Sequence, residues 1–180
     1  MRWVLILASA IASFAADPLY LSTQKKFDQI ADGKLKPGSV VTLSAAELNG
    51  WARAKVPETI PQGLRNPLIE LGSGEATGSA LVDFLKMRGG ETSWLMTKLL
   101  EGERPLKVWI RMSSGGGQAT VSLTRVDLSN ATISGRTLDF LIQNFFKPRY
   151  PEAKIGEPFE LGYSMDRIEV QPSGVRVFMK

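Results

Sequence analysis

The chain carries few of the side chains that usually perform acid–base or nucleophilic catalysis. It contains no histidine and no cysteine, so the commonest general base, metal ligand and thiol nucleophile are all missing. A pair of carboxylates can still hydrolyse a glycosidic bond, because that reaction needs only an acid and a base or nucleophile. The candidates, all within one predicted hairpin, are Glu70, Glu75 and Asp83. They occupy outward-facing strand or turn positions, so the sequence favours solvated surface charge and a protein that is not an enzyme.

Other ligand sites find equally little support in the sequence. The stretch GSGEATG at 72–78 is glycine-rich like a phosphate loop, but such a loop needs a helix directly after it. Here the following residues alternate as in a strand. No Asp-x-Asp-x-Asp-Gly spacing indicates a calcium loop, and the lysines and arginines form no basic stripe of the kind typical of nucleic-acid binding. We therefore expect no cofactor, no metal ion and no nucleic-acid partner.

The first residues predict export. Residues 1–15 combine a positive charge at Arg2, a short apolar run over 4–12 and the small-x-small triplet Ser-Phe-Ala at 13–15, which is typical of a cleaved signal peptide. The alternative is an uncleaved anchor, but the run is much shorter than the about 20 residues that span a bilayer. Because the chain lacks cysteine, it has no acylation site for a lipoprotein. We expect a periplasmic or secreted protein that is not a lipoprotein, with residues 16–180 forming a single α+β domain.

The N-terminal part of this domain reads as two helices with a strand between them. Apolar spacing predicts an amphipathic helix over 18–32 and a short strand over 39–43. Ser44 and Glu47 are spaced as a capping box, which indicates that a second helix begins there. We expect this helix to stop before Pro57.

The rest of the chain is dominated by the two-residue alternation typical of strands. The segments with this pattern are residues 67–71, 76–84, 105–112, 118–128 and 167–179. A one-residue phase shift near Arg125 predicts a β-bulge there. Together these patterns predict an α+β fold with a strongly curved antiparallel β-sheet that is wrapped around or packed on long amphipathic helices.

Two predicted helices carry wide apolar arcs, one over 137–146 and one over 92–102. The arcs contain the candidate ligand-lining residues Leu138, Leu141, Ile142, Phe145, Phe146, Leu95 and Leu99. Trp94 and Phe140 lie on the polar sides of these helices. In one interpretation neighbouring elements cover everything and the core is solid. In the other, the arcs line a lipid-sized cavity and the two aromatic residues contact a membrane or a partner.

Two stretches carry a family resemblance. LSAAELN at 43–49 follows a Thr/Ser-x-x-Glu-hydrophobic-Asn pattern at the start of a helix, and PFELGYSMDRIEVQPSGVRV at 158–177 leads from a proline-apolar segment into a Val-x-Pro-x-Gly hairpin. The first resembles YceB-like proteins and the second resembles LmeA-like proteins, two kinds of small bacterial envelope protein. This resemblance implies a tubular lipid-binding (TULIP-like) architecture, a curled sheet around a long helix. It carries no catalytic residues to this chain.

The sequence thus predicts an exported, non-enzymatic envelope protein that binds a lipid or similar amphiphile between its sheet and helices. A transient contact with a membrane or an envelope protein would accompany that role. The alternative is a ligand-free interaction module of the periplasm or cell envelope that binds another protein through its exposed aromatic residues. The difference between these hypotheses is whether the space beside the helix at 137–146 is hollow.

Overall fold

A computed structural model describes residues 17–59, 63–83, 102–129, 131–147 and 154–180. Its helices are α1 (Pro18–Ala31), α2 (Ala45–Thr59) and α5 (Gly135–Leu141), which continues into a π-helical segment (Ile142–Phe146). Its strands are β1 (Val40–Ser44), β2 (Leu64–Leu71), β3 (Glu75–Val82), β4 (Arg104–Gly115), β5 (Gln118–Leu128), β6 (Ala131–Ser134), β7 (Pro158–Glu160), β8 (Met165–Gln171) and β9 (Gly174–Met179). The predicted signal peptide and the predicted helix over 92–102, apart from Gly102, lie outside the described residues.

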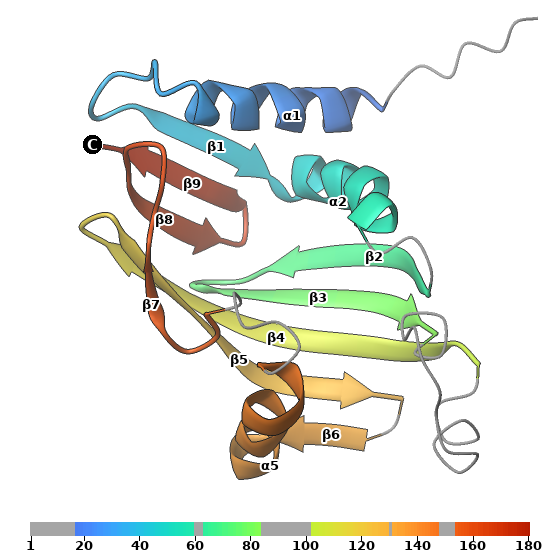
Figure 1. Cartoon of the computed structure of the whole chain (residues 1–180). Helices are drawn as coiled ribbons and strands as arrows, with labels where there is room; N and C mark the ends of the chain where they lie inside the picture. Colours follow the sequence, from blue (N-terminus) through green and yellow to red (C-terminus); the bar gives the residue numbers. More distant parts are fainter. Residues whose placement is uncertain (1–16, 60–62, 84–101, 130, 148–153) are drawn as a thin grey trace, which may run out of the picture.

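The described strands form two antiparallel sheets that lie next to each other (Figure 1). The smaller sheet has the strand order β1-β9-β8, and the larger has the order β2-β3-β4-β5-β6, with β7 paired to β5. All the paired strands are antiparallel. The predicted α+β class and antiparallel pairing are therefore confirmed.

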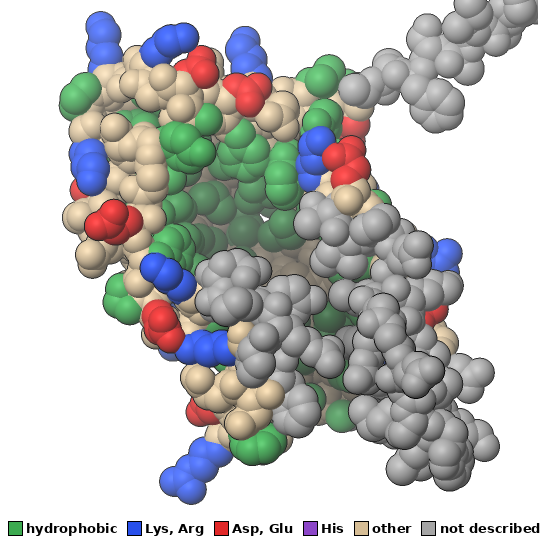
Figure 2. Space-filling view, in the orientation of Figure 1, with side chains coloured by type: hydrophobic (Ala, Val, Ile, Leu, Met, Phe, Trp, Pro, Cys, Tyr) green, Lys and Arg blue, Asp and Glu red, His purple; other side chains and the backbone are tan. Residues whose placement is uncertain are grey.

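The front face of the molecule is hollowed. In the orientation of Figure 1, α1 runs along the top of the molecule and α5 lies in front of β5 and β6 at the bottom. Figure 2, in the same orientation, shows hydrophobic side chains gathered in a hollow between these two helices. The helices thus leave part of this face of the strands uncovered.

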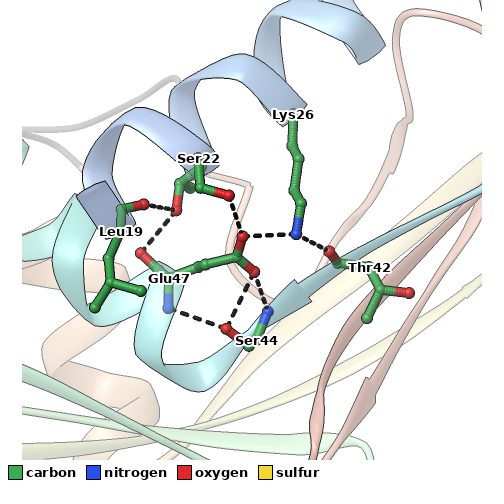
Figure 3. Close-up of polar contacts among 7 residues, drawn as sticks. Leu19, Ser22, Lys26, Thr42, Ser44 and Glu47 are labelled. Atoms are coloured by element: carbon green, nitrogen blue, oxygen red, sulfur yellow. Dashed lines mark hydrogen bonds and ion pairs between the residues drawn. The ribbon is translucent and has the colours of Figure 1, made fainter.

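The start of α2 is the predicted capping box, and its carboxylate joins three elements (Figure 3). The hydroxyl of Ser44 accepts a hydrogen bond from the Glu47 N–H (3.2 Å), and the Glu47 carboxylate accepts one from the Ser44 N–H (2.8 Å). The same carboxylate accepts hydrogen bonds from Ser22 Oγ and Lys26 Nζ of α1, each at 2.6 Å. Lys26 Nζ also donates to the Thr42 carbonyl of β1 (2.7 Å). One carboxylate therefore holds α1, β1 and α2 together.

These bonds determine the protonation of Glu47. Burial alone raises the pKa of this carboxyl, but hydrogen bonds from Lys26, Ser22 and Ser44 outweigh burial and lower its pKa from 4.5 to about 2. Glu47 is therefore ionised throughout the physiological range. The charged form of Glu47 is thus the one that accepts the hydrogen bonds joining α1, β1 and α2.

α1 and α2 cross at close range beside this network. A Cβ atom on Gly50 would lie 2.7 Å from the Leu19 Cβ, so only glycine fits at the crossing. Thr23 is fully buried there, and its Oγ1 lies 2.8 Å from the Leu19 carbonyl oxygen and 2.9 Å from the Glu47 carbonyl oxygen. Phe27 and Trp51 meet edge to face, with ring centroids 5.5 Å apart.

The smaller sheet holds the best-packed described core. Ile30 of α1 packs against Val41, Val177 and Met179, all of them buried. Val41 pairs with Val177 across β1 and β9, which places both side chains on the same face of the sheet. At the end of this pairing, a Cβ atom on Gly174 would lie 2.5 Å from the Leu43 carbonyl oxygen.

The bulge predicted near Arg125 is confirmed. Trp109 pairs with Arg125, whereas the next residue, Ile110, pairs with Leu123, so Thr124 is the extra residue in β5. The bulge keeps the apolar residues before and after it on one face of the sheet, which explains the phase shift in the sequence.

The remaining expectations about shape need correction. The described sheets are not strongly curled; register shifts occur only locally, in the β2–β3, β4–β5 and β8–β9 pairs. α2 continues through Pro57 to Thr59, because a proline in the last turn removes only one backbone hydrogen bond before the helix ends.

The helix expected over 137–146 is not one long α-helix. It consists of seven α-helical residues followed by five in a π-helix. Asn144 Nδ2 donates to the Phe140 carbonyl (2.9 Å), which is the acceptor that the Asn144 N–H would use in an α-helix. The Lys147 N–H instead reaches back to the Ile142 carbonyl (2.8 Å), an i to i−5 bond.

The low pKa of Glu47 predicts a pH-dependent contribution to stability. Because the pKa is lower in the folded than in the unfolded chain, the contribution is complete above about pH 5 and is lost as the pH falls toward 2. A shift from 4.5 to about 2 corresponds to about 3 kcal/mol. We expect wild type to exceed Glu47→Gln in free energy of unfolding at neutral pH, and this difference to shrink on acidification.

Urea unfolding of both proteins at a series of pH values measures this difference. Glu58→Gln is the matched control, because Glu58 lies on the same helix and forms an exposed ion pair with Lys55. A difference between wild type and Glu47→Gln that stayed constant from neutral pH to pH 2 would contradict the assignment.

Candidate functional site

One face of the larger sheet is apolar over nearly its whole width. Strand pairing places Ile69, Gly78, Val108 and Val126 in one row across the sheet, and the rows on either side are similar. The larger apolar side chains on this face are Ile69, Leu71, Leu106, Val108, Ile110, Met112, Val121, Leu123, Val126 and Leu128. Each of them is only half-buried. We call this surface the apolar face.

The opposite face of the same sheet is charged. Lys107 Nζ lies 2.9 Å from the Glu70 carboxylate, and Arg111 Nε donates to the Glu75 carboxylate at 3.0 Å. Arg125 pairs with Asp127 and lies over the ring of Trp109, 4.5 Å from its centroid. Ionic groups thus cover this face and face solvent, which leaves the apolar face as the one on which α5 packs.

The three carboxylates considered for hydrolysis do not converge. Glu70 and Glu75 lie on the exposed, charged face in ion pairs with different partners, as expected from the sequence. Asp83 was expected to face solvent, but it is buried at the end of β3, where its N–H donates to the Gly63 carbonyl (2.6 Å). Among the residues that the structure describes, no group of three or more acidic side chains could hold a metal ion.

The structure describes part of the predicted ligand-lining set. Leu138 and Ile142 are buried, with α5 in contact with β5 and β6. Phe140 is 58% exposed, in agreement with its predicted position on the polar side of the helix. The side chains of the other lining candidates and of the second aromatic residue lie outside the described residues. They are Leu141, Phe145, Phe146, Leu95, Leu99 and Trp94.

The two sheets meet along β8. Backbone groups on the edge of β8 that does not pair with β9 form hydrogen bonds with β4 and with the turns of the larger sheet. The Gly74 N–H donates to the Val170 carbonyl (2.9 Å), and the Gly117 N–H donates to the Asp166 carbonyl (2.7 Å). Between them, Ser114 Oγ donates to the Ile168 carbonyl (2.7 Å) and accepts from the Ile168 N–H (2.8 Å). The Ser114 hydroxyl thus makes the two hydrogen bonds to Ile168 that a neighbouring strand would otherwise make.

An open groove of about 680 Å³ runs along this junction. Its lining comes from Ser73 and Gly74, from residues 112–114 of β4, and from residues 168–173 of β8 and the turn after it. We call it the junction groove. It lies at the border of the apolar face, because Met112 belongs to both.

The Asn49 side chain likewise forms hydrogen bonds with the backbone of an edge strand, β2 of the larger sheet. Its Nδ2 donates to the Ile69 carbonyl (2.8 Å) and its Oδ1 accepts from the Ile69 N–H (2.7 Å), so the side-chain amide occupies the edge of β2. Sequence reasoning singled out neither Asn49 nor Ser114 as an edge cap. The only signal for Asn49 was its place in LSAAELN, and Ser114 had none.

The arrangement can offer apolar contacts and hydrogen bonds to a ligand. The accessible surface is a broad hydrocarbon-lined face, bordered by a groove of hydroxyl and backbone groups. In the part of the chain that the structure describes, no helix has the length and apolar character needed to cross a membrane.

Compared with known proteins, the chain matches no family model, no curated protein and no solved structure. The relationship to YceB-like and LmeA-like proteins therefore stays a prediction from residues 43–49 and 158–177.

The double hydrogen bond of Ser114 predicts a measurable loss when it is removed. Ser114→Ala should lower the free energy of unfolding by about 1–2 kcal/mol, because it leaves both backbone groups of Ile168 without their partner. Urea unfolding measures the free energy, and hydrogen exchange of the Ile168 amide reports on the junction. Ser113→Ala is the matched control, since Ser113 is exposed and should change stability by less than about 0.5 kcal/mol. Equal stability of both variants, with an unchanged exchange rate at Ile168, would contradict the prediction.

Proposed function

We propose that this protein binds a lipid or a similar amphiphile, with the hydrocarbon chain of the ligand on the apolar face. The observation that carries the proposal is the contrast between the two faces of the larger sheet. One face is closed by ion pairs, whereas the other holds ten large apolar side chains that are each only half-buried. Soluble monomers rarely leave a contiguous apolar surface of this kind without a ligand or partner for it.

Hydrophobic burial supplies the driving force for such a ligand. Covering each 100 Å² of apolar surface stabilises a complex by about 2.5 kcal/mol before the entropy of binding is subtracted. A hydrocarbon chain laid across the rows of β4 and β5 would contact Val108, Ile110 and Leu123 together.

The family resemblance supports a more specific form of the proposal. In that form the ligand lies between the larger sheet and the helices beside it, as the resemblance implies. The lining would then include the helix residues expected from the sequence, Leu138, Leu141, Ile142, Phe145, Phe146, Leu95 and Leu99. We infer that the ligand is carried or sensed without being altered, because the chain has no histidine or cysteine and its candidate carboxylates Glu70 and Glu75 are engaged in ion pairs.

We also propose that the protein acts in the bacterial envelope, exported by residues 1–15 and then released as a free periplasmic or secreted protein. The expected mature N-terminus is Ala16. N-terminal sequencing of the protein recovered from the periplasm or the culture medium measures it. Met1 retained on a membrane-bound product would contradict export with cleavage.

A second function, an interaction module without a ligand, is favoured by the exposed aromatic side chains. Phe140 is 58% exposed and Tyr163 is 60% exposed. Such residues often form the centre of protein–protein contacts. Under this hypothesis the purified protein contains no lipid, and Phe140→Ser weakens binding of an envelope protein and leaves the fold intact. Native mass spectrometry before and after organic extraction separates the two hypotheses.

Binding on the apolar face predicts a specific pattern of ligand uptake. Delipidated protein should take up a fluorescent fatty acid saturably, with close to one molecule bound per chain. Ile110→Asn should weaken this binding about tenfold or more, because it places an amide against the hydrocarbon chain. Fluorescence titration measures the affinity.

Arg111→Gln provides the matched control, because Arg111 follows Ile110 in β4 but points to the charged face. Circular dichroism verifies that both variants fold, and Val121→Thr serves as a milder second variant of the apolar face. Absence of uptake by the wild-type protein, or equal uptake by Ile110→Asn, would contradict the proposed function.

A further inference from the structure

The lining of the junction groove includes consecutive residues of β4 and of β8. Neighbouring residues of a strand point to opposite faces, yet Met112 and Ser113 of β4 both line the groove. Ile168 and Glu169 of β8 do the same. The groove therefore lies where apolar residues of the apolar face meet polar residues.

The polar lining of the groove consists mostly of hydroxyl groups. Ser73, Ser113 and Ser173 are exposed, and none of the three hydroxyls is hydrogen-bonded to another described residue. The Ser114 hydroxyl is different, since both of its bonds go to the backbone of Ile168. Three hydroxyls are thus available to a ligand at this border of the apolar face.

The charges near the groove are already balanced. Among the described residues that line it, Glu169 is the only charged one. Its carboxylate accepts a hydrogen bond from Arg167 Nε (3.1 Å), and Arg176 lies 3.5 Å away. No lysine or arginine among the described lining residues faces the groove, so the groove offers no cation to a phosphate or a carboxylate.

From these observations we propose that the junction groove binds the uncharged polyol head group, a sugar or glycerol unit, of an amphiphile whose chain lies on the apolar face. Hydroxyl groups both donate and accept hydrogen bonds, so the three serine hydroxyls match the hydroxyls of a polyol, and the Gln171 amide, whose Nε2 lies 3.5 Å from the Glu169 carboxylate, keeps its oxygen as an acceptor. An anionic head group would meet only the Glu169 carboxylate and uncharged donors. This inference rests on the proposed function, because it needs the hydrocarbon chain to lie on the apolar face.

The test compares probes that share one chain and differ only in the head group. Delipidated full-length protein is titrated, below the micelle concentration, with dodecyl maltoside, dodecyl phosphate and dodecyltrimethylammonium, and each displaces the bound fluorescent fatty acid. We expect the maltoside to bind tightest. The triple variant Ser73→Ala, Ser113→Ala, Ser173→Ala should weaken maltoside binding about tenfold, because up to three hydrogen bonds are lost, and leave binding of the other two probes unchanged.

The matched control is Ser79→Ala with Ser122→Ala, two strand serines that do not line the groove. It should bind all three probes as the wild type does. Urea unfolding verifies that the triple variant remains folded, and the single variant Ser113→Ala gives a smaller effect in the same direction if the triple variant is unstable.

The remaining outcomes are distinguishable from one another. Equal binding of all three probes, or an unchanged maltoside affinity in the triple variant, would overturn the head-group inference while the apolar face stays a lipid site. Failure of every probe to bind would overturn the proposed function itself. Maltose that bound as tightly as dodecyl maltoside would show that the groove takes a free sugar and would overturn its assignment to a lipid.

Discussion

The carboxylate of Glu47 is the interaction on which the arrangement of the N-terminal half depends. Its partners come from α1 and from the residue that ends β1, and the carboxylate itself belongs to the first turn of α2. Without this charge, Lys26 and two serines would lose a shared acceptor whose side chain is only 10% exposed. The pair of helices that borders the hollow, α1 and α2, is therefore held together by the hydrogen bonds and the ion pair of Glu47. Gly50 and Thr23 allow the two helices to approach each other closely.

The two sheets differ in how completely their apolar side chains are covered, and this difference bears on function. In the smaller sheet, Val177 and Met179 are buried beneath α1, as in an ordinary core. In the larger sheet, comparable residues such as Val108 and Val121 stay half-buried. A protein that needed only stability would gain by covering them, at about 25 cal/mol for each Å². The uncovered face is consequently where we place the ligand.

The features predicted correctly from the sequence were those with a local pattern. Alternation along each strand encodes its two faces, so the hairpins and the bulge at Thr124 could be predicted from spacing alone. The Ser44–Glu47 box spans a single turn. By contrast, Asn49 caps a residue 20 positions away and Ser114 caps one 54 positions away, and such contacts leave no periodic pattern. The π-helical segment escaped prediction because it depends on competition between the Asn144 side chain and the backbone for one carbonyl oxygen. The degree of burial on the apolar face escaped it too, because spacing indicates which face a side chain is on and not what covers that face.

The capped edges of the sheets have a consequence for the protein in a crowded compartment. An edge strand can pair with strands of other molecules, and an apolar sheet face beside it increases the tendency to aggregate. In this protein a side chain occupies backbone groups on three bordering strands: Lys26 at Thr42 on β1, Asn49 at Ile69 on β2 and Ser114 at Ile168 on β8. Each cap interrupts the continuous row of donors and acceptors that strand addition requires. At these three edges the molecule can in this way keep strand addition blocked beside a large apolar surface that stays open to a small ligand.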